Sequence, residues 1–472
     1  MKNKKCKKVL FYLSVIILIQ IVIVPHGTLL SSQSLQSLNR TTFFEKSSHQ
    51  EKLTGLFSIF AKNSNVTISK TEEYCEGYTL LSVRYPHSTY LIDMDGTMIK
   101  KWDKNNINPH PSKILSNGSI ISGLSSPTHS YESSELVQFN WMGEIEWNYT
   151  YDLDKQDEFV GVRQHHDFQR EGNPVGYYAP DQKYYEKGKT LILAHETTYN
   201  SSVSLWRLDA DDLIFEVNWN GTLTDFKWLA SNHLNEIGFD LLSRIGIWLN
   251  PGSPGYLLLL PPGDLFHINS VSYLGQNKWF DMGFEQFNPD NIIISSRHAN
   301  FIAIISKKTG NIVWKVGPDF EENNLDQIIG PHHAHMIPKG LPGEGNILVF
   351  DNGGIAGYGL FGGPNQYRLY SKVIEFNPIT FNTIWAYESK NGSILFEPNN
   401  HKFLSPVSSS AQRLPNGNTL ITEAISSRVF EVTSEKEIVW EYYSQFGSRV
   451  YRSYRIPPEW IPGNPSNYRD WS

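Results

Sequence analysis

The sequence predicts an all-β fold: a six-bladed β-propeller with four-stranded antiparallel blades, preceded by an N-terminal transmembrane helix. Three observations support this prediction. Two kinds of hairpin alternate along the chain, their apolar residues recur with a period of two, and 13 Trp with 24 Tyr favour strands over helices. An elongated β array or a pair of sandwiches is the alternative, and radial closure is preferred because it leaves fewer exposed strand edges.

The composition is that of a globular chain and excludes some partners. With 472 residues and 40% hydrophobic residues, the chain can bury a large core. A formal net charge of -7 and a pI near 6.1 provide no basic face for a polyanion. Nucleic acid is therefore not an expected partner.

The N-terminus carries a targeting signal, because five lysines in residues 1–8 precede an uncharged apolar run over 9–24. Residues 1–8 are predicted to be a cytoplasmic basic segment and residues 9–25 a single-pass, type II signal-anchor in the membrane. A cleaved signal peptide and a core helix are the alternatives. The C-terminal domain is then lumenal or extracellular in the secretory pathway, or periplasmic if the source is bacterial.

Two cysteines occur in the chain, and the prediction places them on opposite sides of the membrane. Cys6 precedes the apolar run and Cys75 follows it, so they cannot pair within one chain. Sequons compatible with a glycoprotein occur at Asn39, Asn65, Asn117, Asn148, Asn200, Asn220 and Asn391.

The first kind of hairpin has alternating apolar residues, a tight turn and a strand that ends at or near Trp. It occurs at 90–102, 136–147, 205–219, 301–314, 373–385 and 429–440. The second kind is clearest at 411–422, with relatives at 112–122, 166–194, 267–296 and 335–350, and a truncated copy at 77–83 that needs a partner strand from elsewhere. Two hairpins make one four-stranded blade.

The repeats set the predicted domain limits. Polar residues 26–73 are expected to form a stalk, and the propeller to occupy 74–472. Residues 224–262 fit no repeat and are expected to be an insertion over one face. The proline-rich tail, about 452–472, is expected to wrap the surface.

Histidines recur just before the second kind of hairpin. They are His165 and His166, followed by Asp167; His267, followed by Asn269; and His332, His333 and His335. Equivalent positions in a propeller lie at one end of the inner strands, so these side chains should converge at the axis. Few carboxylates lie in register with them, so a metal is not expected.

Arg297 closes the second hairpin of the fourth unit and supplies a fixed positive fork. Together with the histidines, such a fork favours binding of a tetrahedral oxyanion such as sulfate or phosphate. Asn352 follows the fifth-unit strand and is a second candidate substrate-binding residue beside Asn269.

These residues resemble the arylsulfate sulfotransferases over about 90–460. The shared features are HHD at 165–167, H-x-N-S-V at 267–271, S-S-R at 295–297, and a fifth-blade histidine followed by D-N-G. The resemblance implies a six-bladed propeller that moves a sulfuryl group from a phenolic sulfate ester to a phenolic acceptor, without the nucleotide sulfate donor. It implies a sulfohistidine intermediate and no cofactor.

The resemblance also implies roles for the candidate residues. The nucleophile is expected at His332, with His333 and His335 as alternatives. The transferred group's negative charge would be neutralised by Arg297, His267 and either His165 or His166, and Asn269 would add a neutral donor. The chain departs from the periplasmic members of the family in lacking their disulfide.

Two other functions stay open at this stage. One is a non-catalytic propeller that binds a sulfated or anionic ligand, or a protein partner. The other is a quinone- or metal-dependent propeller oxidoreductase.

Overall fold

The chain divides after residue 63, and its second unit, residues 64–472, is compact. The computed structural model describes residues 65–103, 106–126, 131–150, 161–172, 178, 185–239, 241–249, 264–320, 325–357, 366–388 and 403–463. The predicted basic segment, the anchor at 9–25 and nearly all of the stalk lie outside these residues. Across the described ranges, no helix is long and apolar enough to cross a membrane.

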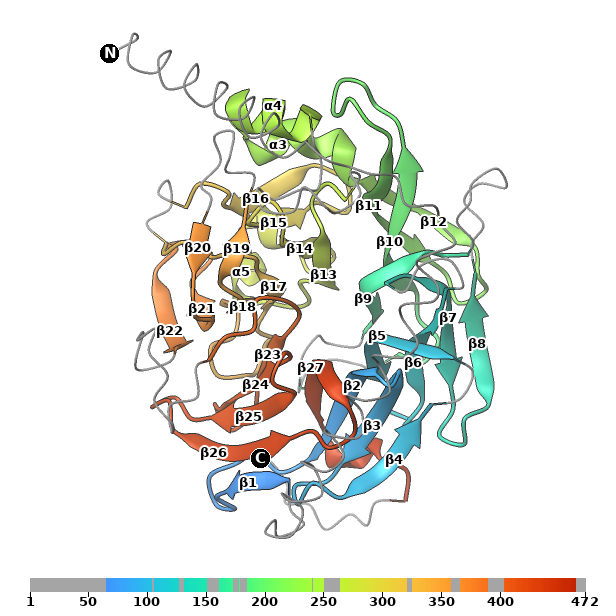
Figure 1. Cartoon of the computed structure of the whole chain (residues 1–472), viewed down its shortest axis with the longest axis vertical. Helices are drawn as coiled ribbons and strands as arrows, with labels where there is room; N and C mark the ends of the chain where they lie inside the picture. Colours follow the sequence, from blue (N-terminus) through green and yellow to red (C-terminus); the bar gives the residue numbers. More distant parts are fainter. Residues whose placement is uncertain are drawn as a thin grey trace, which may run out of the picture. The chain divides into compact units, whose positions relative to one another are not determined.

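Antiparallel sheets stand around a common centre in the second unit, which is the arrangement of a β-propeller (Figure 1). The first sheet has the order β27 (Ser448–Ile456), β2 (Tyr78–Tyr85), β3 (Ser88–Ile92), β4 (Met98–Trp102). The next is eight-stranded and comprises β5 (Ile107–Ile114), β6 (Ile120–Ser125), β7 (Ser133–Phe139), β8 (Ile145–Tyr149), β9 (Gln164–Arg170), β10 (Thr190–Thr198), β11 (Leu208–Val217) and β12 (Leu223–Leu229). A single residue pair, Ser133 with Gln164, joins its two four-stranded runs.

The later sheets follow in chain order. One contains β13 (Ile268–Tyr273), β14 (Ile292–Ser296), β15 (Phe301–Ile305) and β16 (Ile312–Val316). The next contains β17 (His332–Met336), β18 (Ile347–Asp351), β21 (Lys372–Phe376) and β22 (Thr383–Glu388), with β19 (Gly354–Ala356) and β20 (Gln366–Arg368) as a separate pair. The last has the order β1 (Val66–Ser69), β26 (Ile438–Tyr443), β25 (Arg428–Val432), β24 (Thr419–Glu423), β23 (Ser410–Arg413).

The two ends of the described chain close the ring. The truncated copy at 77–83 is β2, and its missing partner is β27, which pairs with it from Tyr78↔Ile456 to Tyr85↔Ser448. Residues 452–456 therefore belong to a strand, and the surface wrap was predicted to begin too early, because the prolines start only at Pro457. Likewise β1 pairs with β26, so the end of the predicted stalk is a strand.

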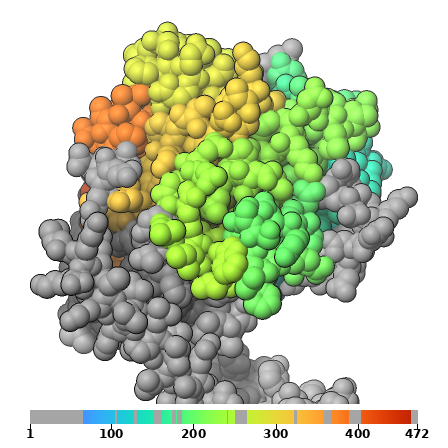
Figure 2. All heavy atoms as spheres, turned by 90° about the horizontal axis from the view of Figure 1, so that it is seen from above, coloured from blue at the N-terminus to red at the C-terminus, as the bar shows by residue number. Residues whose placement is uncertain are grey.

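The expected insertion also begins later than predicted. Strand β11 pairs with β12 through a turn in which Gly221 has a φ of +82°, so the hairpin predicted at 205–219 lies further along the chain. The short helices η1 (Ala230–His233), α3 (Leu234–Ile237) and α4 (Leu241–Leu249) follow. The Glu236 carboxylate accepts the Ile312 N–H at 2.7 Å, so α3 packs against β16; Figure 2 shows this green segment beside the yellow one.

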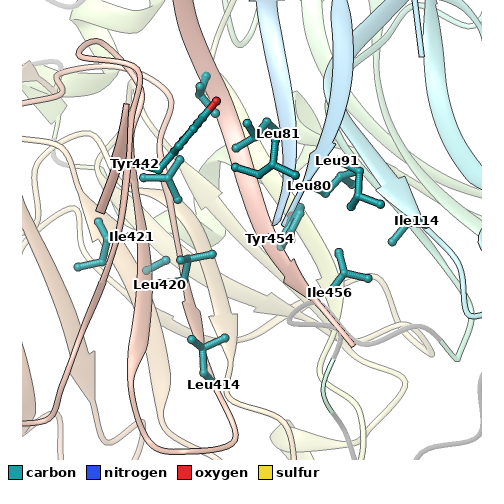
Figure 3. Close-up of a cluster of buried hydrophobic side chains, with 14 of the residues drawn as sticks. Leu80, Leu81, Leu91, Ile114, Leu414, Leu420, Ile421, Tyr442, Tyr454 and Ile456 are labelled. Carbon is teal, nitrogen blue, oxygen red and sulfur yellow. The ribbon is translucent and has the colours of Figure 1, made fainter. Parts of the chain in front are cut away.

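Three other short helical elements are described. Two of them, α5 (Lys278–Asp281) and η2 (Glu285–Phe287), lie between β13 and β14, and η5 (Pro458–Trp460) follows β27. Between neighbouring sheets the core is apolar. Figure 3 shows part of it, where Leu80 and Leu91 of the first sheet and Ile114 of β5 lie in one buried cluster with Leu420 and Ile421 of β24. Burying such side chains stabilises the fold by roughly 1.5–3 kcal/mol each.

The strands nearest the centre differ from this core, because they are buried and yet polar (Figure 1). Strand β9 reads QHHDFQR and β17 reads HHAHM, and both are almost wholly buried. Buried polar groups need partners. The hub of the propeller is therefore a network of hydrogen bonds and ion pairs, and the candidate site lies within it.

Candidate active site

The candidate histidines lie on strand irregularities. His166, His267 and His333 have φ angles of 55°, 50° and 53°, and the registers of β9, β13 and β17 shift beside them. A non-glycine residue in this region costs about 1–3 kcal/mol, and a bulge turns side chains away from strict alternation. The local backbone thus directs neighbouring histidines to different places.

Five imidazoles form a continuous row that runs along β9 and β10 and the turns beside β13 and β14. Ring centroids lie 3.6 Å apart for His195 and His165, 5.0 Å for His165 and His166, 4.6 Å for His166 and His267, and 4.5 Å for His267 and His298. The structure therefore brings together the predicted His165, His166 and His267. It adds His195 and His298, which sequence reasoning did not select as site residues.

The row is held mainly neutral. Burial, and next the neighbouring His195, hold the pKa of His165 well below its usual range, and burial with His267 does the same for His166. Burial lowers the pKa of His298 to about 3. Imidazoles this close cannot all be positively charged.

Asp264 fixes the orientation of His267, whose Nδ1 lies 2.5 Å from the carboxylate. Burial alone would raise the pKa of Asp264, but His267 and His298 lower it. The His267 side chain is 24% exposed, whereas the His165 side chain is fully buried. His267 is thus the better candidate to meet a substrate, and its Nε2 is the nitrogen left to exchange a proton.

His332 is held in one tautomer. Its Nδ1 lies 2.7 Å from Asn352 Oδ1 and 3.0 Å from the Gly330 carbonyl, both of which accept, while its Nε2 accepts the Ser408 N–H at 3.2 Å. The Asn352 amide nitrogen donates to the carbonyls of Ser405 and Ser408, which fixes Oδ1 towards the ring. His332 therefore carries its proton on Nδ1 and a lone pair on Nε2.

Arg297 lies close enough to His332 for its charge to act on the imidazole ring. Its backbone N–H donates to the His267 carbonyl at 3.1 Å, and its Nη2 donates to the Pro406 carbonyl at 3.4 Å. Burial, and next the charge of Arg297, hold the pKa of His332 well below its usual range. His332 is consequently neutral near pH 7.

Asn269 is buried and used within the protein. Its Nδ2 donates to the Pro331 carbonyl at 2.7 Å, and its Oδ1 accepts from the Ser295 hydroxyl at 2.8 Å. These bonds join β13 to β14 and to the residue before β17. Both Asn269 and Asn352 are thus hydrogen-bonded to groups of the protein itself, and the substrate-binding role expected for them stays a prediction.

The charge of Arg452 acts on His333 and His335. The Nδ1 of His333 donates to the Ala411 carbonyl at 3.0 Å, and its Nε2 lies 3.3 Å from the Tyr454 hydroxyl. The Nδ1 of His335 donates to the His333 carbonyl at 2.9 Å, and burial lowers the pKa of His335 to about 4. Of the three β17 histidines, His332 alone is held next to the Arg297 charge.

The hub also contains a buried charge network of Asp167, Lys113 and Arg452. Asp167 pairs with Lys113 at 2.7 Å and with Arg452 at 3.1 Å. Burial would raise the pKa of Asp167, but Lys113 and Arg452 lower it. Sequence reasoning missed Arg452 because it lies in the tail expected to wrap the surface.

Two groups of side chains have atoms suited to hold a metal ion in the described part of the chain. One is His165, His195 and Asp212, and the other is Asp264, His267 and His298; within each, the ligand atoms lie within 4.8 Å of one another. In the second group a hydrogen bond already occupies His267 Nδ1 and Asp264 Oδ2.

The sequence, including the histidines of this hub, matches a known protein family. The family model for arylsulfotransferase (ASST) matches residues 45–446. The chain belongs to the arylsulfotransferase family. Membership supports an enzyme of the sulfotransferase type that acts on phenolic substrates, at the level of the family.

No curated protein matches this arylsulfotransferase chain. Among solved structures, a protein of unknown function from Bacteroides caccae matches with 11% identity and a TM-score of 0.43, over 81% of this chain and 99% of its own. A streptogramin B lyase matches with 13% identity and a TM-score of 0.36, over 82% and 85%. Virginiamycin B lyase from Staphylococcus aureus matches with 10% identity and a TM-score of 0.34, over 81% and 88%. Likeness at this level carries no argument about function.

Proposed function

We propose that this arylsulfotransferase moves a sulfuryl group from a phenolic sulfate ester to a phenolic acceptor through a sulfohistidine on His332, without the nucleotide sulfate donor. The observation that carries the proposal is the tautomer of His332, whose proton is held on Nδ1 by Asn352. The Nε2 lone pair of a neutral imidazole is a competent nucleophile near pH 7.

In the first step, the Nε2 lone pair of His332 forms a bond to sulfur as the bond from sulfur to the phenolic oxygen breaks. The electron pair of the broken bond stays on the leaving oxygen, which takes a proton from Nε2 of His267. The Ser408 N–H is released from His332 Nε2 and donates to a sulfuryl oxygen instead. Asp264 stabilises the protonated His267 ring that this step needs.

The second step reverses these transfers with the acceptor. The acceptor phenol gives its proton to His267 Nε2, and its oxygen attacks sulfur as the sulfur–Nε2 bond breaks. His332 regains its lone pair. Donor and acceptor therefore react in turn at one place, which gives ping-pong kinetics.

Arg297 stabilises the transferred group in both steps. Its fixed guanidinium charge neutralises the sulfuryl oxygens, whose charge is redistributed as sulfur leaves one oxygen for nitrogen. No reorganisation of solvent is required, because Arg297 is buried.

We also propose six blades for the propeller, counting β5–β8 and β9–β12 as separate blades because one residue pair joins them. Residues 9–25 are proposed as a membrane anchor, which rests on the lysines and the apolar run of the sequence. Recovery of the full chain in a carbonate-washed membrane fraction, and release of a chain that lacks residues 1–25, would support the anchor. A full-length chain in the soluble fraction would contradict it.

The test of the function is transfer from 4-nitrophenyl sulfate to phenol, followed by absorbance. His332→Asn is expected to abolish transfer, and His335→Asn, on the same strand but bonded to the His333 carbonyl, to retain it. Equal loss in both variants with intact folds, or transfer by the first, would contradict the role of His332. Ligand binding without turnover by the wild type would support the non-catalytic alternative.

A further inference from the structure

Three polar residues lie side by side on three neighbouring strands. His165 is on β9, His195 on β10 and Asp212 on β11, and His195 is the direct cross-strand partner of Asp212. The Nε2 of His165 lies 3.4 Å from Asp212 Oδ1. The relative exposures are 0%, 7% and 0%, so water does not solvate these groups freely.

The side chains carry unsatisfied atoms that point to a ligand. In the part of the chain that the structure describes, the buried Nε2 atom of His195 has no hydrogen-bond partner, and that of His165 makes no hydrogen bond beyond its 3.4 Å contact with Asp212. Leaving a buried polar atom unpaired costs about 1–3 kcal/mol, so these atoms require an explanation.

The other nitrogen of each ring is already occupied. His195 Nδ1 lies 2.8 Å from the Glu132 carboxylate, which Arg163 holds through two hydrogen bonds. His165 Nδ1 lies 2.8 Å from His166 Nδ1. A carboxylate on the far nitrogen of a histidine is the usual outer support of a metal ligand, since it fixes the tautomer that leaves Nε2 free.

Charge leads to the same conclusion. Asp212 is fully buried, its carboxylate accepts the Ile268 N–H at 3.1 and 3.2 Å, and its ion-pair partner among the described residues is His165. A divalent cation would give this buried carboxylate a positively charged partner.

We propose that His165, His195 and Asp212 bind a divalent transition-metal ion, with zinc as the probe, through the two Nε2 atoms and a carboxylate oxygen. Two imidazoles and one carboxylate with an open fourth position form a known zinc ligand set. The proposal departs from the expectation, drawn from the sequence, that no metal binds. It does not depend on the sulfohistidine mechanism.

One adjustment is needed for binding. The His165 and His195 rings stack with 18° between their planes, so their lone pairs run nearly parallel. One ring must turn about χ2, a torsion that is broad for histidine, before both lone pairs converge on an ion about 2.0–2.1 Å away.

The test uses the full chain, stripped with a chelator and then dialysed against micromolar Zn²⁺. Metal analysis is expected to give about one zinc per chain, and Co²⁺ in its place to give the visible absorption of a low-coordinate site. His195→Gln and Asp212→Asn should lose this zinc. Glu132→Gln should weaken it by about 10- to 100-fold, because it removes only the outer support.

The matched control is His298→Gln, which alters the other histidine–carboxylate group and should retain the zinc. A zinc-dependent rise in the melting temperature of the wild type gives a readout that does not require any variant to fold. A wild type that binds no zinc and does not change its melting temperature, or a folded His195→Gln that binds zinc like the wild type, would overturn the proposal. None of these readouts uses transfer activity.

Discussion

His335 offers a quantitative test of how strongly the hub excludes charge. The side chain is buried on β17, and burial lowers its pKa to about 4. In an unfolded chain its pKa is about 6.5, so below that pH the unfolded state binds a proton that the folded state does not. The stability from neutral His335 is complete above pH 6.5 and is lost as pH falls towards 4.

The magnitude follows from the two pKa values. At pH 5, which is about 1.5 pH units below the unfolded-state pKa, protonation of His335 lowers the free energy of unfolding. At 1.36 kcal/mol for each pH unit, the loss is about 2 kcal/mol. His335→Asn keeps a donor for the His333 carbonyl but cannot take the proton. Between pH 7.5 and pH 5, the wild type should therefore lose about 2 kcal/mol more of its free energy of unfolding than the variant.

Urea unfolding of both proteins at the two pH values measures this difference, and the subtraction cancels the contribution of the other titrating groups. Equal losses in the two proteins would refute the reasoning. Such a result would mean that His335 takes up its proton in the folded state at an ordinary pH.

Further predictions concern the site and its support. Asn352→Ala should lower kcat by about 10- to 100-fold, or about 1.4–2.8 kcal/mol, because the Gly330 carbonyl alone then holds His332 Nδ1. Steady-state kinetics measures this change, and an unchanged kcat would contradict the prediction. Arg297→Ala should lower kcat by about 100- to 1,000-fold in the same assay, and a change confined to KM would instead indicate uniform binding. Asp167→Asn should destabilise the fold by about 3–5 kcal/mol in urea unfolding, because two buried cations lose their partner; a loss under 1 kcal/mol would contradict this.

Much of the strand pattern could be predicted, because period-two alternation and turn residues are local signals. The hairpins at 301–314 and 411–422 correspond to β15–β16 and β23–β24. Strand β27 could not be predicted in this way, since its buried Arg452 and Arg455 resemble surface residues. They are paired with Asp167 and Glu431 from other sheets, and such partners are known only when the ring is closed.

The site was predictable only in part, for a similar reason. The recurrence of histidine before successive hairpins predicted the convergence of His165, His166 and His267. The separation of His332 from His333 was not predictable, because it depends on a bulge with a positive φ. His195 became a neighbour of His165 through sheet pairing, which no local motif encodes.

The most direct measurement is the mass of the protein after brief exposure to 4-nitrophenyl sulfate without acceptor. Digestion above neutral pH, which protects a sulfur–nitrogen bond, and fragmentation of the β17 peptide would locate any adduct. The mechanism predicts one sulfuryl group on His332, removed when phenol is added and absent from His332→Asn. Turnover by a wild type that carries no adduct, or an adduct on His333, His335 or any other residue, would contradict it.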